Sequence, residues 1–569
     1  MNSLTPSAGA GEPLALSAQP ARPRLLSLAR GSPLGGAALA FAGLAGSLLV
    51  AYATRWGPWA FSDGAGYIIL ARNLLRGRGL GLMRASGEFH PLSLHPPLFP
   101  LTLAAFGFAG ADLAEVARWL NAALFGITIV LGGVLVYRAT GRRWLGPGAG
   151  LTLLASPLLV YLFSGAMSEP LFFVLTLGSL IALQGYARRR ERIYLVAAGI
   201  ASGLALITRY PGVALLAPGV VAILASRARD WKGKAVDCSL FVGLAGAPML
   251  AWLGWLSAQP GADPPRQWTW DLTDLLSRVR PVVEGVGYAL WDWLPFSGWA
   301  SDRSIPFKQA LLALIVVAVV VLTVLAFLRL RSGLLRTWPC DPSVLLGLLL
   351  GTFALAYFGQ LTFTYLFSLP ALDPSDIDQR ILAPILVAIG LYLFVLAELL
   401  MRSATSRRWL AIVPSGLLLL YAAWFLPQAW NIASSLHQAG AGYTSQSWRN
   451  SPTIAALHAL PTQTPIITNE SAAVMLWLDR PAYDFKLPAA DQPGSALDRF
   501  GDGADELASI FREQGAALVL FNSISAQLAG SYGEEGAGTR LAALTQGLEL
   551  FARLDDGQVF FYPIEGQSE

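Results

Sequence analysis

Long apolar runs recur along most of the chain, and they constrain its fold more than any other feature. A helix needs roughly 20 apolar residues to cross the ~30 Å hydrocarbon core of a bilayer. Runs of suitable composition lie at 35–54, 115–138, 145–163, 168–187, 193–209, 211–226, 236–256, 308–329, 343–362, 381–401 and 409–427. We therefore expect a polytopic α-helical membrane protein with about eleven spans, the shortest being 193–209 and 211–226.

The composition agrees with a chain that is solvated mainly by lipid. Hydrophobic residues make up 54% and charged residues only 13%, whereas soluble domains carry about 25% charged residues. The net charge of +4 comes from short basic clusters between apolar runs, which argues against a nucleic-acid-binding surface. The two cysteines, Cys238 and Cys340, lie in a span start and a predicted cytoplasmic loop, so we expect no disulfide framework.

Basic linkers between the apolar runs predict the orientation. They fall between every second pair of spans and read RPRLLSLARG, YRATGRRW, ARRRER, SRARDWKGK, RLRSGLLR and RSATSRR. By the positive-inside rule these linkers face the cytoplasm. The sequence therefore predicts a multi-pass protein of the inner or plasma membrane with a cytoplasmic N-terminus and an extracytoplasmic C-terminal tail.

The chain divides into three predicted regions. Residues 1–32 are small, polar and proline-rich, which is typical of a disordered cytoplasmic segment. Residues 33–429 form the membrane domain, and its first outer loop, 55–114, is expected to carry juxtamembrane helices. Residues 430–569 read as an extracytoplasmic α/β domain, with strands at PIITN and ALVLFN and a hairpin turning at Asp556-Gly557.

The stretch FSDGAGYIILARNLLRGRGL, residues 61–80, places an acid shortly after the first span. Asp63 could cap the N-terminus of an amphipathic helix, or it could line a site at the membrane surface. Tyr67 and Ala71 follow at helical spacing on the same face. The opposite face carries basic side chains that we expect near lipid phosphates, namely Arg72, Arg76 and Arg78.

A second acid, Glu169, begins a span in GAMSEPLFF. An acid next to Pro170 in a first turn is ordinary helix-start chemistry. A carboxylate at the mouth of a span is nevertheless expensive unless it faces protein or water. Asp63 and Glu169 could share one cavity, and the sequence alone does not decide this.

Two arginines stand at predicted outer span ends. Arg209 ends one apolar run and Arg380 opens another. Snorkelling towards the interface would explain both, but a guanidinium on the outer side also suits a phosphate ligand. Asp376 and Asp378 could instead pair with Arg380 and fix the loop.

Two of the four histidines, His90 and His95, lie in the proline-rich first outer loop. They are a weak metal-site pattern and suit hydrogen bonding to a polar substrate or to Asp63 equally well. We expect no cofactor. The tryptophan-rich loop 268–299 reads as an interfacial belt or, alternatively, as a sugar platform.

The order of several blocks resembles a known family. Asp63 with Tyr67 and NLLRGRGL is followed by HPPLFPLTLAAFGFAG, MSEPLFF, LALITRYPGVALLAPGVVAIL and QRILAPILVAIGLYL. Over roughly residues 35–430 this pattern resembles the polyprenyl-phosphate-dependent glycosyltransferases with the GT-C fold. The similar proteins are bacterial family-39-like enzymes, related to protein O-mannosyltransferases and lipid A aminoarabinose transferases.

The resemblance implies a membrane glycosyltransferase that moves a sugar from a polyprenyl-phosphate donor to an acceptor hydroxyl on the extracytoplasmic face, with inversion. It implies Asp63 and Glu169 as the catalytic acids, with Asp63 as general base or acceptor-orienting group. It also implies Arg380 as a ligand of the lipid phosphate. Further candidates for donor contacts are Arg209, Tyr67, His90 and His95.

Two departures from the family pattern leave the acceptor open. Protein O-mannosyltransferases usually have an Asp-Glu pair where this chain has Asp63-Gly64, and the third outer loop is too short for an inserted β-trefoil domain. The acceptor is therefore expected among envelope glycans, lipids or proteins, with membrane lipids as further partners and no nucleic acid.

Two other functions remain open at this point. A transporter or flippase for a lipid-linked sugar would need charges within the membrane or broken helices in two related halves; here the charges cluster at one face and no repeat is visible. A scaffold that binds cell-wall polymer through its tail would not need Asp63, Glu169 and Arg380 together.

Overall fold

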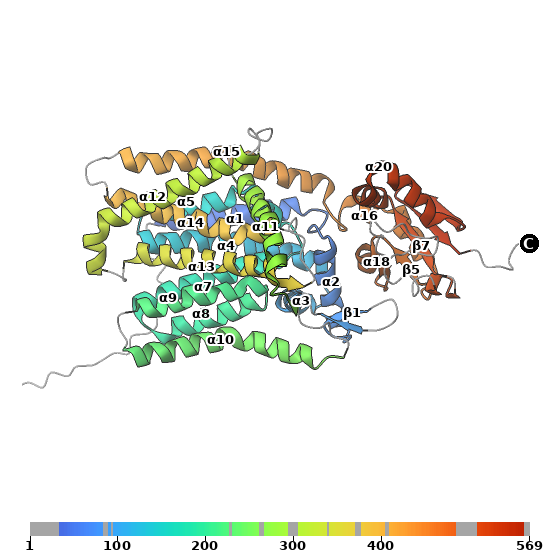
Figure 1. Cartoon of the computed structure of the whole chain (residues 1–569), viewed down its shortest axis with the longest axis horizontal. Helices are drawn as coiled ribbons and strands as arrows, with labels where there is room; N and C mark the ends of the chain where they lie inside the picture. The colour runs from blue at the N-terminus through green and yellow to red at the C-terminus, as the bar shows by residue number, and fades with distance from the viewer. Residues whose placement is uncertain are drawn as a thin grey trace, which may run out of the picture.

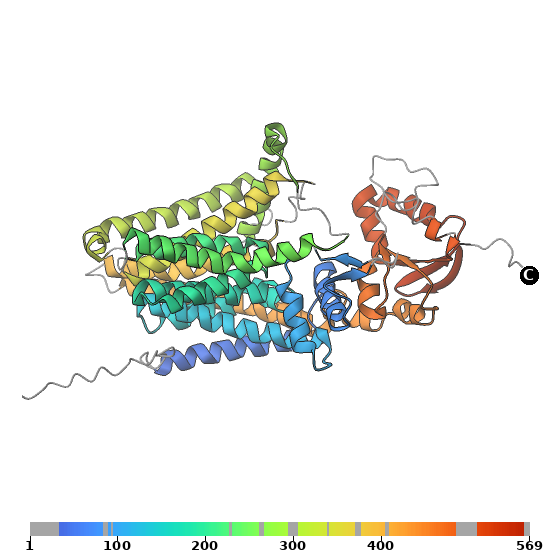
Figure 2. The same ribbon diagram turned by 90° about the horizontal axis from the view of Figure 1, so that it is seen from below.

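The computed structural model describes residues 33–83, 89–92, 95–226, 230–260, 267–293, 305–337, 341–369, 377–403, 409–484, 509–511 and 513–562. A bundle of long helices makes up most of the molecule, and a small domain with a β-sheet follows at one end of the bundle (Figures 1 and 2). The predicted disordered segment 1–32 and Cys340 lie outside the described residues. Cys238 is a free thiol.

The bundle helices run side by side in both views. They are α1 (Pro33–Ala53), α4 (Leu113–Thr140), α5 (Leu145–Leu154), α6 (Pro157–Phe163), α7 (Glu169–Arg189), α8 (Arg192–Leu206), α9 (Leu216–Ala225), α10 (Trp231–Ser257), α12 (Ile305–Thr337), α13 (Pro342–Phe367), α14 (Gln379–Ser403) and α15 (Trp409–Ala439). A polytopic α-helical fold is thereby confirmed.

The described residues contain fewer full-length apolar spans than the eleven or so expected. Among the described residues, seven helices are long and apolar enough to cross a membrane, or eight if the bent pair α5–α6 counts as one. The expected span 145–163 bends by 65°, because α5 ends and Pro157 starts a new helix capped by Ser156. The expected spans 193–209 and 211–226 are shorter apolar helices, interrupted by a 3₁₀ turn (Tyr210–Leu215) with Pro211 at its start.

Several basic linkers lie together at one end of the bundle. The Arg188 side chain donates to the backbone oxygen of Arg138, which joins the α4 and α7 ends. Glu398 binds Arg142 and Arg402, and Arg402 also binds Asp341. The alternation of basic linkers therefore matches the fold, while their assignment to the cytoplasmic side stays a prediction.

The opposite end carries the smaller elements that follow the spans (Figure 1). They are α2 (Ser62–Leu75), the hairpin β1 (Gly81–Met83) and β2 (Phe89–Pro91), α3 (Leu98–Gly107), the pair β3 (Gln267–Trp268) and β4 (Ser368–Leu369), and α11 (Leu272–Asp292). Arg278 of α11 donates to the Leu366 and Ser368 carbonyls. It thereby satisfies backbone groups that the end of α13 leaves open.

The C-terminal domain is a five-stranded sheet in the order β6-β5-β7-β9-β8. Its elements are α16 (Gln446–Arg449), α17 (Pro452–His458), β5 (Ile466–Thr468), α18 (Ser471–Leu478), β6 (Tyr483–Asp484), β7 (Ala517–Phe521), α20 (Ser523–Thr545), β8 (Glu549–Leu554) and β9 (Gly557–Phe561). The central β5 and β7 are fully buried and parallel. This confirms an α/β fold with strands at PIITN and ALVLFN.

The predicted hairpin is present, with its turn one residue earlier than expected. Leu554 of β8 pairs directly with Gly557 of β9, and Gly557 also pairs with Phe521 of β7. Asp555 and Asp556 therefore form the turn. The Asp556 side chain accepts hydrogen bonds from the Thr453 backbone NH and hydroxyl, at 3.1 and 2.5 Å, which explains why an acid stands there.

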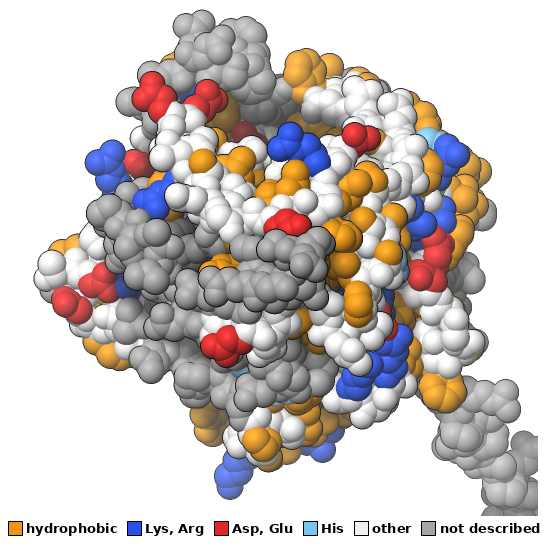
Figure 3. Space-filling view, turned by 90° about the vertical axis from the view of Figure 1, so that its right-hand side faces the viewer, with side chains coloured by type: hydrophobic (Ala, Val, Ile, Leu, Met, Phe, Trp, Pro, Cys, Tyr) orange, Lys and Arg blue, Asp and Glu red, His pale blue; other side chains and the backbone are white. Residues whose placement is uncertain are grey.

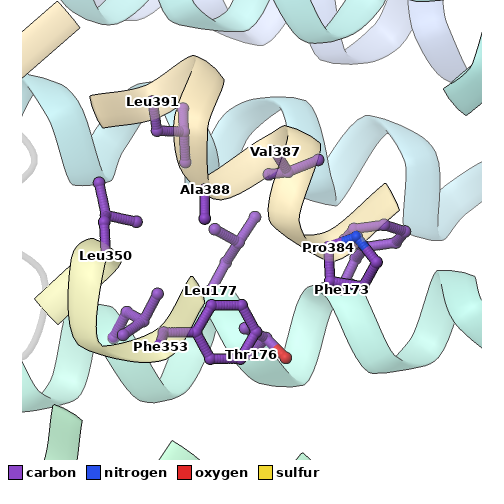
Figure 4. Close-up of a pocket in the computed structure, with 10 residues that line it drawn as sticks. Phe173, Thr176, Leu177, Leu350, Phe353, Pro384, Val387, Ala388 and Leu391 are labelled. Carbon is purple, nitrogen blue, oxygen red and sulfur yellow. The ribbon is translucent and has the colours of Figure 1, made fainter. Parts of the chain in front are cut away.

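A small cavity lies between α7, α13 and α14 (Figure 4). Its walls are apolar apart from Thr176 and include Phe173, Leu177, Phe353 and Leu391. Its volume of about 10 Å³ is close to that of one water molecule, and an apolar void of this kind stays dry. The cavity is a packing defect of the bundle and does not suit a ligand.

The charge cluster around Glu398 generates a stability prediction. Glu398→Gln removes the carboxylate that two guanidiniums share, and the Glu398 side chain is only 3% exposed. Because Arg142 and Arg402 are half-exposed, the expected loss lies between the ~1 kcal/mol of a surface pair and the ~3–5 kcal/mol of a buried one. Thermal unfolding of the detergent-solubilised protein measures it.

Glu191→Gln is the matched control. Glu191 lies at the same end of the bundle, is exposed, and makes no capping hydrogen bond at the start of α8. Its substitution removes the same charge and should leave the Tm nearly unchanged. Equal effects of the two substitutions would mean that the Glu398 ion pairs contribute nothing specific.

Candidate active site

Helix α2 carries Asp63 in its first turn but does not use it as a cap. The residue at the N-cap position is Phe61, in an extended conformation, and no side chain makes a capping hydrogen bond there. Of the two alternatives for Asp63, helix capping is therefore not found. The acid still lies near the positive end of the helix dipole, where a carboxylate is favourable.

The Asp63 carboxylate faces two basic side chains from distant parts of the chain. Its Oδ1 lies 3.5 Å from Nε2 of His95, and its Oδ2 lies 3.4 Å from Nη1 of Arg380. The hydrogen bond from His95, opposed by partial burial and helped by the charges of His95 and Arg380, lowers the pKa of Asp63 to about 2. Asp63 is therefore anionic across the physiological range.

Glu169 forms the second half of the site. It begins α7 and is 1% exposed. Arg209 Nη1 lies 2.6 Å from its Oε1, and Arg380 Nε lies 3.7 Å from the same atom. Within the described part of the chain, Glu169 Oε2 and Arg380 Nε have no hydrogen-bond partner.

Arg380 thus lies between both acids, and the two acids are neighbours in the structure. Asp63 and Glu169 belong to one cluster, joined through a single guanidinium. Asp378 is a third acid within reach, 3.7 Å from Arg380 Nε, and its other oxygen accepts from the Ile381 backbone NH. Asp376 lies outside the described residues.

Tyr67 lies one turn after Asp63 and lines the same cluster. Its hydroxyl is 3.4 Å from Ser168 Oγ, and its ring centroid is 5.3 Å from that of His95. Burial raises the pKa of Tyr67 above its usual value, so its hydroxyl stays protonated and able to donate. Arg209 also donates to Ser168 Oγ, at 3.4 Å.

Two contacts of the cluster were missed by sequence reasoning. Ser168 bridges Tyr67 and Arg209, and its only sequence signal was its place before Glu169. Tyr357, buried in α13, donates to the Ile381 carbonyl at 3.0 Å beside Arg380. A lone tyrosine within an apolar run could have indicated it.

The turn before Glu169 is held by the segment before α2. The Trp59 backbone NH donates to Ser164 O, and Trp59 O accepts from the Ala166 NH, both at 2.9 Å. The Gly165 carbonyl accepts from the Asn121 side chain. A Cβ at Gly165 would lie 2.4 Å from the Trp59 ring, so only glycine fits this approach.

The same packing also constrains position 64, where this chain has glycine after Asp63 instead of a second acid. A Cβ at this position would lie 3.2 Å from Ala166 O and from the Ala60 Cβ, which is a tight fit. A larger acid next to Asp63 would therefore press against the turn that leads to Glu169.

The structure does not bring every candidate residue to the cluster. His90 lies in β2, opposite Leu82 of the β1–β2 ladder. The expected lipid-facing role of the α2 arginines is not found for Arg72 and Arg76. Both form ion pairs with Asp479 at the end of α18, because the C-terminal domain packs on that face of α2.

A cleft of about 540 Å³ lies where α2, the turn before α4 and the C-terminal domain meet. It is lined by basic, acidic and aromatic side chains, including Arg76, Arg449, Asp112, Glu115 and Trp477. Figure 3 looks onto the end of the molecule that the C-terminal domain forms, where acidic and basic side chains are interspersed on the surface. That distribution does not suit a polyanionic ligand.

The pKa of Asp63 predicts how its contribution to stability depends on pH. Because the folded-state pKa of about 2 lies below the ordinary 3.8, the charged carboxylate stabilises the fold above pH ~4, and this contribution is lost as the pH falls towards 2. The side chain is 35% exposed, so the contribution should not exceed ~1 kcal/mol.

The measurement compares the Tm of the wild type and of Asp63→Asn between pH 2 and pH 6. The difference should be nearly constant above pH ~4 and shrink as the pH approaches 2, where about half of the folded-state Asp63 carboxylates are protonated. A difference that already disappears near pH 5 would contradict the ion pairs described for Asp63.

Comparisons with known proteins find one family model and several solved structures. Residues 107–239, which include Glu169 and Arg209, match the model of the dolichyl-phosphate-mannose-protein mannosyltransferase family. Apo ArnT from Cupriavidus metallidurans is 14% identical with a TM-score of 0.49, covering 90% of this chain and 95% of that one. ArnT bound to undecaprenyl phosphate gives 14% and 0.46, covering 90% and 96%.

The yeast S. cerevisiae Pmt1-Pmt2 complex bound to the sugar donor is 17% identical with a TM-score of 0.32, covering 39% of this chain and 33% of that one. No curated protein sequence matches significantly. Residues 107–239 thus resemble the dolichyl-phosphate-mannose-protein mannosyltransferase family, within a chain that carries several helices long and apolar enough to cross a membrane.

Proposed function

We propose that the chain transfers a sugar from a polyprenyl-phosphate donor to an acceptor hydroxyl on the extracytoplasmic face of the membrane, with inversion at the anomeric carbon. The observation that supports this most directly is the guanidinium of Arg380, which lies 3.4 Å from Asp63 and 3.7 Å from Glu169. A base and an anion-binding group thus stand side by side at one end of the bundle. The family matched by residues 107–239 supports a lipid-phosphate-linked donor.

Arg380 is the group best suited to take the donor phosphate. Arg209 is closely paired with Glu169, at 2.6 Å. Arg380 has only longer contacts, of 3.4 to 3.7 Å, to its three acids, and its Nε has no hydrogen-bond partner among the described residues. A phosphate would supply the short, charge-assisted hydrogen bonds that this guanidinium lacks.

Glu169 acts as a positioning group in this proposal. At 1% exposure it is too deeply buried to receive a proton from an acceptor that enters from solvent. Its charge offsets those of Arg209 and Arg380 and holds both guanidiniums at the site. Ser168 contacts both Tyr67 and Arg209, so both Ser168 and Tyr67 lie beside these ion pairs.

Asp63 is the proposed base, and its low pKa sets a condition on that role. A carboxylate with a pKa of about 2 is a weak base, since proton transfer is most effective when the pKa lies near the working pH. When the donor phosphate binds Arg380, the phosphate offsets the positive charge that Asp63 experiences. The pKa of Asp63 then rises in part, since the hydrogen bond from His95, the largest cause of its lowering, stays in place. Donor binding thereby makes Asp63 a somewhat stronger base.

The reaction is a single displacement. The acceptor oxygen forms a bond to the anomeric carbon while its proton passes to Asp63, at a gain of roughly 10²–10⁴-fold for general base catalysis. The bond between the anomeric carbon and the phosphate oxygen breaks, and its electron pair leaves on the phosphate. Arg380, supported by Arg209, stabilises that charge electrostatically.

Asp63→Asn tests the base. The amide cannot accept the proton, so sugar transfer should fall by at least ~10²-fold, while binding of the lipid donor is retained because Arg380 and Arg209 are unchanged. The assay incubates purified protein in detergent with a panel of polyprenyl-phosphate sugars and measures transferred and hydrolysed sugar. Turnover of this variant at the wild-type rate would contradict the assignment of Asp63 as the base.

Asp378→Asn is the matched control. Asp378 contacts the same guanidinium but is 51% exposed, and asparagine can still accept from the Ile381 NH. Transfer should remain within a few-fold of the wild type. A detergent solution has no compartments, so product formed there also separates an enzyme from a transporter of lipid-linked sugars.

Arg380→Gln tests the phosphate site. Loss of a preorganised cation at a developing negative charge typically costs ~10²–10³-fold, so kcat/KM for the donor should fall by that order. Arg380→Lys should recover part of it, because lysine keeps the charge but not the planar pair of donors. Equal activity of Arg380→Gln and wild type would show that the phosphate binds elsewhere.

A further inference from the structure

The backbone that leads into α2 is held from two sides. On one side Trp59 exchanges two hydrogen bonds with Ser164 and Ala166, in the turn before Glu169. On the other side lies the connector, residues 438–449, which joins α15 to the C-terminal domain. The segment 56–60 is thus sandwiched between two chain regions that are remote from it in sequence.

Residues of the connector donate hydrogen bonds to backbone carbonyl groups of the segment 56–60. The Tyr443 NH donates to Ala60 O at 2.7 Å, and the Thr444 hydroxyl donates to Pro58 O at 2.6 Å. Arg449 Nε donates to Trp56 O at 2.9 Å. In return, the Trp56 indole donates to Gln438 O at 3.1 Å.

The far end of α2 is also tied to the C-terminal domain. Arg72 donates to the Leu476 carbonyl at 3.1 Å and pairs with Asp479 at 3.3 Å. Arg76 pairs with the other oxygen of Asp479. Both ends of the helix that carries Asp63 are therefore fixed by the C-terminal part of the chain.

We infer that the connector 438–449 is a positioning element of the active site, which sets the place of Asp63 relative to His95 and Arg380. The catalytic meaning of this placement rests on the proposed function. Asp63 comes three residues after Ala60, and α2 has no side-chain cap of its own. The preceding backbone therefore determines where the carboxylate lies.

The contact at Gly442 leaves no room for any other residue. Gly442 has φ +61, and an added Cβ would lie 2.3 Å from Ala60 O and 2.7 Å from Ala60 C. Those neighbours are backbone atoms, which cannot turn aside as a side chain can. A Cβ here would push the segment 56–60, and Asp63 with it, away from the connector.

Gly442→Ala tests the inference, with Gly515→Ala as its matched control. Gly515 lies in the C-terminal domain with φ +63 and open space where the Cβ would be, so it carries the same backbone strain without the contact to Ala60. Misplacement of a catalytic group by ~1 Å costs on the order of 10²-fold. We expect kcat to fall ~10–100-fold in Gly442→Ala and to stay near wild type in Gly515→Ala.

Two further readouts separate positioning from loss of folded protein. The donor KM and the number of donor molecules bound per chain should not change, because Arg380 and Arg209 lie outside the connector. Hydrogen–deuterium exchange should increase in the peptide covering 56–63. A wild-type kcat in Gly442→Ala would overturn the inference, as would a loss of kcat matched by an equal loss of donor-binding sites.

Thr444 supplies a milder test that keeps the chain shape. Thr444→Val replaces the hydroxyl by a methyl group and leaves Pro58 O without its donor, whereas Thr444→Ser keeps the donor. Thr444→Val should lower kcat by about tenfold at unchanged donor KM, the effect of roughly one lost hydrogen bond, and Thr444→Ser should restore it. Equal kcat values for the two variants would contradict the inference.

Comparing Asp63→Asn with the connector variants distinguishes a failure of this inference from a failure of the proposed function. If Asp63→Asn is inactive while both connector variants are fully active, Asp63 is catalytic and the connector does not position it. If Asp63→Asn is active, the assignment of the base fails whatever the connector variants do.

Discussion

The removal of Glu169 from water is the constraint on which the rest of the site depends. A carboxylate that is 1% exposed at the mouth of a membrane helix is tolerated only if cations accompany it. Arg209 and Arg380 provide that charge from two other parts of the chain. Once Arg380 is drawn to Glu169, it also comes within reach of Asp63, and a single guanidinium joins the two acids.

The charged residues of the site could be predicted from sequence because each interrupts or borders an apolar run, where charge is costly. Asp63, Glu169, Arg209 and Arg380 stand out for that reason, whereas Ser168 and Gly442 have no such signal. The lipid-facing role of Arg72 was wrong because its partner, Asp479, lies 407 residues away. Pro157 and Pro211 divide apolar runs that had been expected as continuous spans, because length and composition do not reveal such breaks.

The two ends of the bundle use charge in different ways. At the basic-linker end, Glu398 binds Arg142 and Arg402 at 2.8 and 2.7 Å, close contacts that satisfy each group. At the end with Asp63, the contacts of Arg380 are longer and one of its nitrogens has no hydrogen-bond partner among the described residues. The first arrangement pairs its charged groups closely, and the second leaves a guanidinium nitrogen without a hydrogen bond within the described residues.

The hydrogen bond from Tyr443 to Ala60 has a consequence for biosynthesis. The two residues are 383 positions apart in the chain, so a ribosome that has just released α2 must complete nearly all remaining helices before this bond can form. Contacts of such long separation form late in folding. The nascent protein therefore contains Asp63 and its first apolar helix early, but this hydrogen bond before α2 forms only after α15 has been made. A chain that ends before Tyr443 lacks it.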